Sequence, residues 1–274
     1  MSLVGTNALC RRCFTFLRAS TTRTLATQSS EHEKEVQKFD VLSSGWWKDD
    51  KDPLYLMNNV RIPLLKSLAR EIDVPSPEIL DVGCGGGYLA EELAKQRFSV
   101  TAIDPSEDMI KIATKHAQQF PGELDLQYQC ATVAEVMEQF DIVVSSEVVE
   151  HVPCVASFVS QCADRVRPGG GLMFTTINRT VQSWLFGILL AEHVAGLVPP
   201  GTHEYHKLVP PHTLTGVISD SGFDIVTVTG LGFNPLTRQW RTSSDLSINY
   251  AVTAIKRNLN ECNEDDFDDN YEIR

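Results

Sequence analysis

The chain has 274 residues, of which 42% are hydrophobic, and a formal net charge of −12 at pH 7. This length is sufficient for one large domain with extensions. The negative charge disfavours a nucleic-acid substrate, because phosphate binding requires a basic surface. No apolar run reaches about 18 residues without a charge, so the sequence predicts no transmembrane helix.

The first 30 residues differ in composition from the rest of the chain. They contain four arginines and many serines and threonines but no Asp or Glu, and acidic residues begin at Glu31. This composition is typical of a mitochondrial transit peptide, since a secretory signal would have a compact apolar segment before its cleavage site. The alternative is a disordered basic tail. A fluorescent reporter fused to residues 1–35 should enter mitochondria, and a diffuse cytosolic signal would contradict this prediction.

Seven cysteines are scattered along the chain. Cys10 and Cys13 have the spacing of a metal-binding pair but lie in the predicted transit peptide without a second pair, so we expect no zinc site there. The others are interpreted as buried or incidental thiols of a reducing compartment.

Helical periodicity follows over residues 54–68. Pro63 predicts that the main helix begins at that proline, because proline favours the first turn. Arg61 comes just before this point and could reach the carboxylate of a ligand, although spacing alone favours a solvated charge.

The stretch 79–88 predicts a strand, a tight turn and a helix, with the turn formed by Gly83-Cys84-Gly85-Gly86-Gly87. Glycines allow a sharp turn and the close approach of a ligand. The next apolar run ends in Asp104, 21 residues after Gly83. Adjacent parallel strands place both at one carboxyl edge, where a carboxylate can accept hydrogen bonds from ribose hydroxyls. These features predict a nucleoside site; the alternative is an ordinary glycine turn.

Tyr88 stands where the dinucleotide fingerprint G-x-G-x-x-G has its last glycine. That glycine lets the helix present its N-terminus to a pyrophosphate. Its replacement argues against a nicotinamide dehydrogenase and favours a ligand with ribose but no phosphate, such as S-adenosylmethionine.

Further strands and helices alternate up to residue 177, which predicts a mainly parallel sheet with helices on both faces. The predicted helices cover residues 105–119, 153–166 and 214–221, and the strands cover 124–130, 140–146 and 172–177, with a wide turn at 168–171. Residues 223–229 and 248–255 predict a final antiparallel pair.

The apolar segment 184–198 is too short to span a bilayer; it predicts a core helix or a membrane-surface segment, and composition favours the core. The acidic end predicts a disordered tail.

A second group of polar residues follows the strand 140–146. If Ser146-Glu147-Val148-Val149-Glu150-His151-Val152 is helical, Glu147, Glu150 and His151 share one face. Two carboxylates and an imidazole suit a divalent ion, which could chelate a catechol and lower the pKa of the attacking hydroxyl. Alternatively, the segment caps a helix and lines an adenine pocket. His203 or His206 could be a general base, but a polar surface loop is the commoner explanation.

Together these motifs resemble the ubiquinone-biosynthesis O-methyltransferases, over roughly residues 38–256. The segments that carry the resemblance are 57–61, 81–87, 146–152, 175–180, 198–203 and 232–235. The glycine string alone matches most methyltransferases of this fold, whereas its combination with Glu-Val-Val-Glu-His and Pro-Gly-Thr-His is much more specific. The segment 130–132 lacks the acid that often contacts adenine in this fold, and Arg179 has no evident role.

The resemblance implies an α/β, Rossmann-like class I S-adenosylmethionine-dependent methyltransferase fold, with a mainly parallel seven-stranded sheet and one antiparallel strand. This domain would cover residues 31–258, with an apolar, membrane-facing insertion at 181–200 and a disordered tail at 259–274. The donor would contact Arg61, Gly83, Gly85, Asp104 and Ser146. A divalent ion, Mg²⁺ by expectation, would be held by Glu147, Glu150 and His151, and no catalytic residue is assigned.

The resemblance also implies the substrates, a polyprenyl dihydroxybenzoate and 3-demethylubiquinol. The enzyme would lie on the matrix side of the mitochondrial inner membrane, within a ubiquinone-biosynthesis complex. Two alternatives stay open: a methyltransferase acting on another small catechol or acid, and a non-catalytic scaffold that keeps the fold.

Overall fold

The computed structural model describes residues 46–47, 52–183 and 205–258. The predicted transit peptide, Cys10, Cys13, the apolar segment 184–198, His203 and the acidic tail lie outside these residues.

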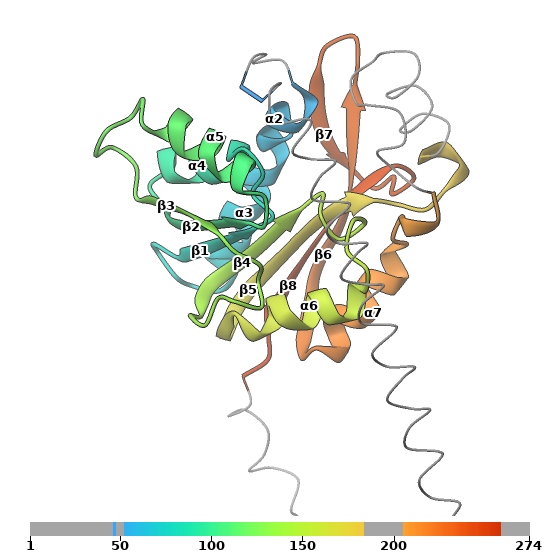
Figure 1. Cartoon of the computed structure of the whole chain (residues 1–274). Helices are drawn as coiled ribbons and strands as arrows, with labels where there is room; N and C mark the ends of the chain where they lie inside the picture. Colours follow the sequence, from blue (N-terminus) through green and yellow to red (C-terminus); the bar gives the residue numbers. More distant parts are fainter. Residues whose placement is uncertain (1–45, 48–51, 184–204, 259–274) are drawn as a thin grey trace, which may run out of the picture.

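A single twisted sheet forms the centre of the molecule (Figure 1). Its strands are β1 Glu78–Val82, β2 Ser99–Asp104, β3 Leu126–Cys130, β4 Phe140–Ser146, β5 Val166–Ile177, β6 Phe223–Asn234, β7 Gln239–Ser243 and β8 Asn249–Lys256. They are arranged in the order β3-β2-β1-β4-β5-β8-β6-β7. The strands β1 to β5 pair in parallel, while β8 runs antiparallel to both β5 and β6. The predicted α/β fold and the final antiparallel pair are therefore confirmed.

The predicted number of strands was one too small. The strand β6 continues to Asn234 and turns back into β7, so the described sheet has eight strands, two of them antiparallel to the others. The Asn234 side chain accepts hydrogen bonds from the backbone N–H groups of Leu236 and Thr237 and so closes the hairpin. The sequence did not reveal this extension, because Gly230 interrupts the pattern of strand-forming residues. A glycine is required there by a tertiary contact, since a Cβ on Gly230 would lie 1.7 Å from the Asp245 carbonyl oxygen.

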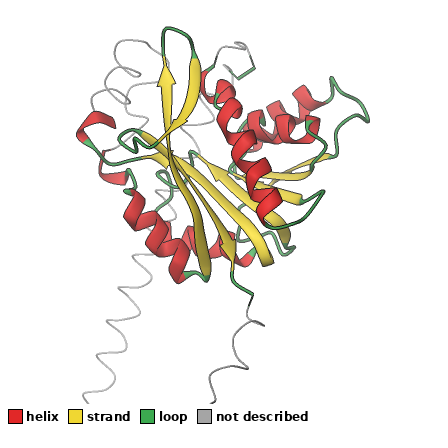
Figure 2. Ribbon diagram, turned by 180° about the vertical axis from the view of Figure 1, so that it is seen from behind, coloured by secondary structure: helices red, strands yellow, loops and turns green. Residues whose placement is uncertain are grey.

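Helices cover both faces of the sheet, as predicted (Figures 1 and 2). One face carries α3, α4 and α5, and the other carries α6 and α7. Side chains alternate between the two cores along each strand: Ile79 packs with Leu93 of α4, whereas Leu80 packs with Val159 of α6. The helices are α2 Pro53–Leu56, α3 Asn58–Glu71, α4 Tyr88–Lys95, α5 Glu107–Ala117, α6 Val155–Asp164, α7 Pro211–Asp220 and the short 3₁₀ helix η3 Tyr205–Lys207.

Two local predictions around proline were wrong. The helix α3 begins at Asn58 and continues through Pro63. Proline there removes a backbone N–H donor and crowds the carbonyl one turn earlier, but the burial of Leu65 and Leu68 against the sheet stabilises the helix. The predicted turn at 168–171 belongs to β5, whose pairing with β4 is irregular between Phe140 and Ile142.

Candidate active site

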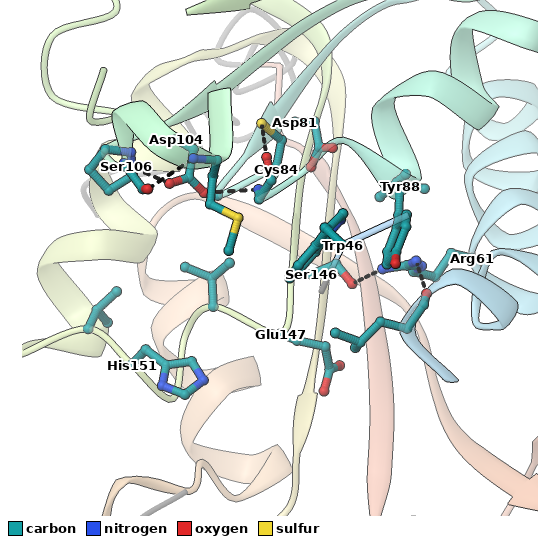
Figure 3. A pocket seen from close by; sticks show the side chains of 18 residues that line it. Trp46, Arg61, Asp81, Cys84, Tyr88, Asp104, Ser106, Ser146, Glu147 and His151 are labelled. Atoms are coloured by element: carbon teal, nitrogen blue, oxygen red, sulfur yellow. Dashed lines mark hydrogen bonds between the residues drawn. The ribbon is translucent and has the colours of Figure 1, made fainter. Parts of the chain in front are cut away.

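A pocket opens at the carboxyl ends of β1, β2 and β4 (Figure 3). Ligands bind at this edge of open α/β sheets, where neighbouring strands connect in opposite directions. The residues predicted to contact a donor all line this pocket, namely Arg61, Gly83, Gly85, Asp104 and Ser146. Glu147 and His151 line it as well. Figure 3 shows Arg61, Ser146, Tyr88 and Trp46 gathered at one end of the pocket and Asp104 and Ser106 at the other.

The glycine turn after β1 has the backbone geometry that the sequence predicted. Gly83 has φ +75 and Gly85 has φ +53, values that side chains other than glycine rarely adopt. The N–H groups of Gly83 and Cys84 donate to the Ile103 carbonyl oxygen at 2.8 and 3.0 Å. A Cβ on Gly83 would lie 2.5 Å from a methyl group of Val148. The turn is therefore held against β2 on one side and against the segment after β4 on the other.

Asp104 ends β2 and is fixed by the backbone on both sides. Its Oδ2 accepts the N–H of Gly85 at 2.9 Å, and its Oδ1 accepts the N–H of Ser106 at 2.8 Å. The Ser106 hydroxyl in turn caps α5 by accepting the N–H of Met109. Because each carboxylate oxygen has two lone pairs, this orientation leaves acceptor capacity facing the pocket.

Arg61 is buried, which contradicts the solvated charge that spacing alone favoured. Its Nη1 donates to the Ser146 hydroxyl at 2.8 Å, and its Nη2 donates to the Asn58 side chain and the Leu54 carbonyl oxygen at 2.6 Å each. Its Nε has no hydrogen-bond partner in the described structure. Burial lowers the pKa of Arg61 to about 10, although the charge of Asp81 opposes the change.

Asp81 is a site residue that the sequence analysis did not single out. It is 1% exposed, lines the same pocket as Arg61, and its Oδ2 has no hydrogen-bond partner in the described structure. Burial raises the pKa of Asp81 to about 7, while the Arg61 charge lowers it. The sequence did contain an indication of this role, because Asp81 is an acidic residue within an otherwise apolar strand. A carboxylate oxygen and a guanidinium N–H without partners in one pocket complement the ammonium and carboxylate groups of an amino acid.

The predicted metal residues do not form a helix. Residues 147–152 form a bend and a short turn at 149–151, and Glu147, directly after β4, has φ +58. Glu147 accepts hydrogen bonds from the Thr175 hydroxyl at 2.8 Å and the Asn249 amide at 3.1 Å. Helical spacing was therefore the wrong basis for bringing these side chains together; β5 and β8 orient Glu147 instead.

Glu150 is 2% exposed and lies deeper than Glu147. Its Oε2 accepts the Thr176 hydroxyl at 2.8 Å, and its Oε1 has no hydrogen-bond partner in the described structure. Burial first, and then the charge of Glu150, raise the pKa of Glu147 to about 8. Within residues 46–47, 52–183 and 205–258, no group of three or more His, Cys, Asp or Glu side chains is placed to hold a metal ion.

Of the remaining residues, His206 lies apart from this arrangement. His206 lies in η3, where its carbonyl oxygen accepts a hydrogen bond from Arg179. Residues 131–133 line a second cavity that shares Gly83, Pro105, Val148 and Val152 with the pocket. Trp46 also lines the pocket, although the sequence around it offered no signal of this role.

The fold and the pocket together define a class I S-adenosylmethionine-dependent methyltransferase. The methyltransferase domain family matches residues 57–228. Magnesium protoporphyrin IX methyltransferase from Synechocystis PCC 6803 with bound SAH has a TM-score of 0.55 at 20% identity, covering 75% of this chain and 85% of that one. A possible histamine N-methyltransferase from Thermotoga maritima has a TM-score of 0.57 at 13% identity, covering 81% and 99%. These two similarities support the fold.

Closer relatives define the family. The mitochondrial ubiquinone biosynthesis O-methyltransferase of Rattus norvegicus is 37% identical over 260 residues, which cover 89% of this chain and 75% of the relative. The ubiquinone biosynthesis O-methyltransferase of Coxiella burnetii (strain RSA 493 / Nine Mile phase I) is 39% identical over 233 residues, covering 83% and 97%. The chain belongs to the ubiquinone biosynthesis O-methyltransferase family, which confirms the resemblance seen in the sequence.

Proposed function

We propose that the protein transfers the methyl group of S-adenosylmethionine to a catechol oxygen of a polyprenyl dihydroxybenzoate and, in the same pathway, of 3-demethylubiquinol. The family supports the reaction and the substrate class. The observation that carries the donor assignment is a pair of buried polar atoms without hydrogen-bond partners in the described structure, Oδ2 of Asp81 and Nε of Arg61, in the pocket beside the glycine turn. S-adenosylmethionine has a free amino acid group that such a pair can bind, whereas a nicotinamide dinucleotide has none.

In this proposal the donor lies along the carboxyl edge of the sheet. Asp104 accepts hydrogen bonds from the ribose hydroxyls, and the amino acid portion faces Arg61, Ser146 and Asp81. The adenine extends past Gly83 into the second cavity, where residues 131–133 contact it. The methyl group then points toward Glu147 and His151, which leaves that side of the pocket for the acceptor.

The chemistry requires alignment more than activation by the protein. The sulfonium is already a good leaving group, so the protein must place oxygen, methyl and sulfur in line and exclude water. The C–S bond breaks as the O–CH₃ bond forms, S-adenosylhomocysteine leaves, and the catechol hydroxyl loses its proton. Arg61 is buried and Asp104 is hydrogen-bonded to backbone N–H groups, so both side chains have fixed positions. A donor bound to them would be fixed as well, which favours such alignment.

The described structure does not bring Glu147, Glu150 and His151 together as a metal site, but two features of the carboxylates favour a divalent ion. These are the Oε1 of Glu150, which has no hydrogen-bond partner in the described structure, and the pKa of Glu147, which burial and the charge of Glu150 raise to about 8; a bound cation would compensate for both. Glu147 and Glu150 would hold Mg²⁺ through hard oxygen ligands, with His151 as the third protein ligand. Once bound, the ion supplies positive charge that lowers the pKa of a catechol hydroxyl.

The proposed location is the matrix side of the mitochondrial inner membrane, within a ubiquinone-biosynthesis complex. Four arginines without acids at the N-terminus and relatives named as mitochondrial support it, although bacterial relatives match equally well. In the described part of the chain, no helix has the length and apolar character needed to span a bilayer. We propose a peripheral contact through the insertion 181–200, whose first described residues include the 63% exposed Val181.

The function is tested by incubating the protein with methyl-labelled S-adenosylmethionine, Mg²⁺ and a short-tail prenyl dihydroxybenzoate. We expect label in a ring ether. The same assay with dihydroxybenzoate that has no tail tests the second candidate, a methyltransferase for small catechols, and we expect much slower turnover. Equal turnover of both acceptors would contradict a lipid substrate, and no transfer to either would leave the scaffold as the better explanation.

A further inference from the structure

An aromatic cluster at the mouth of the pocket connects the N-terminal segment to the glycine turn. The Trp46 ring stacks on Tyr88 with centroids 4.9 Å apart, and Trp47 meets the same tyrosine edge-on at 4.7 Å. The Trp47 ring also stacks on His116 at 3.5 Å. Tyr88, which replaces the last glycine of a dinucleotide fingerprint, therefore provides the surface on which both tryptophans pack.

Trp47 anchors this segment. Its indole Nε1 donates to the Gly86 carbonyl oxygen at 2.7 Å, and its backbone N–H donates to the Tyr88 hydroxyl at 3.2 Å. Its φ of +59 is rare for a residue with a large side chain and is maintained by these contacts. The anchor fixes where the preceding residue, Trp46, must lie.

Trp46 lies directly on the glycine turn. A Cβ on Gly86 would be 2.2 Å from Cδ1 of Trp46, and one on Gly85 would be 3.1 Å from its Cζ2. The φ of Gly86 is not in the left-handed region, so its lack of a side chain serves this contact rather than the turn. The indole is therefore part of the wall of the pocket, on the side of Arg61 (Figure 3).

The indole Nε1 of Trp46 is buried without a hydrogen-bond partner in the described structure. A buried N–H donor without an acceptor is costly. The Nε of Arg61, in the wall of the same pocket, is also unpaired. Two unpaired N–H donors in one pocket wall, one of them cationic, are complementary to a carboxylate.

We propose that Trp46 is a donor-binding residue whose indole N–H donates, together with Arg61, to the carboxylate of the methionine portion of the donor. This inference rests on the proposed donor and adds a specific contact to it. S-adenosylmethionine and S-adenosylhomocysteine both carry this carboxylate, so Trp46 should bind them equally. A ligand that lacks the amino acid portion, such as 5′-methylthioadenosine, should not be affected by Trp46.

The test is calorimetric binding of these three ligands to the full-length protein and its Trp46→Phe variant, which keeps a ring but loses the N–H. We expect the affinity for S-adenosylmethionine and S-adenosylhomocysteine to fall about 10- to 100-fold, the range for a lost hydrogen bond to a charged group. The affinity for 5′-methylthioadenosine should change less than about twofold, which would also show that the variant is folded.

Two further variants sharpen the result. Gly86→Ala should displace the unchanged indole and reproduce the ligand pattern of Trp46→Phe. Trp47→Phe removes the hydrogen bond to Gly86 that holds the anchor; because it loosens the position of Trp46 but leaves its indole N–H intact, it should show the ligand pattern of Trp46→Phe with a smaller loss of affinity.

Three outcomes would overturn the inference. They are undiminished affinity of Trp46→Phe for S-adenosylmethionine, an equal loss for 5′-methylthioadenosine, and a loss for S-adenosylmethionine without one for S-adenosylhomocysteine, which would indicate a contact with the sulfonium charge instead. If the unaltered protein failed to bind S-adenosylmethionine at all, the proposed function would fail rather than the role of Trp46.

Discussion

Replacing Asp104 by asparagine should weaken binding of S-adenosylmethionine about 100-fold. The carboxylate is held by the N–H groups of Gly85 and Ser106, so its position does not depend on the ligand. A hydrogen bond to a charged group contributes about 1.5–3 kcal/mol. If Asp104 accepts hydrogen bonds from two ribose hydroxyls, as proposed, loss of its charge should cost about 3 kcal/mol, which corresponds to about two orders of magnitude in affinity.

Asp108→Asn provides the matched control for Asp104→Asn. Asp108 lies in the first turn of α5, is exposed, and pairs with Lys111 on the protein surface. The two variants change the net charge equally, but only Asp104 lines the pocket. Calorimetric titration should show nearly unaltered affinity in the Asp108 variant. Unchanged donor affinity in the Asp104 variant, with wild-type thermal stability, would refute the ribose assignment.

The donor side of the site was predictable because it is built by local chain geometry. A buried strand that ends in glycines folds in one way, and the next strand brings its last residue alongside. Spacing alone therefore placed Gly83 and Asp104 at one carboxyl edge of the sheet, where the structure has them, and the donor contacts assigned to them stay a prediction. The eighth strand was not, because Gly230 serves a contact with the distant Asp245 and gives no local signal.

Side chains brought in by other elements were predicted less well. Arg61 is buried within α3, which begins before Pro63 and continues through it, and a local rule for proline does not foresee this. Glu147 is oriented by Thr175 and Asn249, residues 28 and 102 positions away. Trp46 depends on a platform formed by Tyr88. Each of these placements is a tertiary contact, so residue spacing within one segment could not reveal it.

Glu150→Gln should abolish most methyl transfer and leave donor binding nearly unchanged. Glu150 lies outside the donor pocket wall, and its unpaired, buried Oε1 is a strong candidate ligand for a cation. The amide keeps the size of the side chain and an acceptor for Thr176 but removes the charge that a divalent ion requires. If the ion lowers the pKa of the attacking hydroxyl, its loss should reduce kcat by at least about 100-fold, the lower range of acid–base contributions. Glu123→Gln, an exposed and remote change, should leave kcat unaltered.

The pH dependence gives a second measurement of the same carboxylate pair. Burial and the charge of Glu150 raise the pKa of Glu147 to about 8, which favours its protonated form at neutral pH. A cation must displace this proton, so the apparent affinity for Mg²⁺ should rise as the pH increases toward 8 and then level off. In Glu150→Gln both the affinity for Mg²⁺ and its dependence on pH should decrease, since one ligand charge and one cause of the raised pKa are removed together. Full turnover of the unaltered protein in excess chelator, or of Glu150→Gln with Mg²⁺, would show that these carboxylates orient the acceptor without a metal ion.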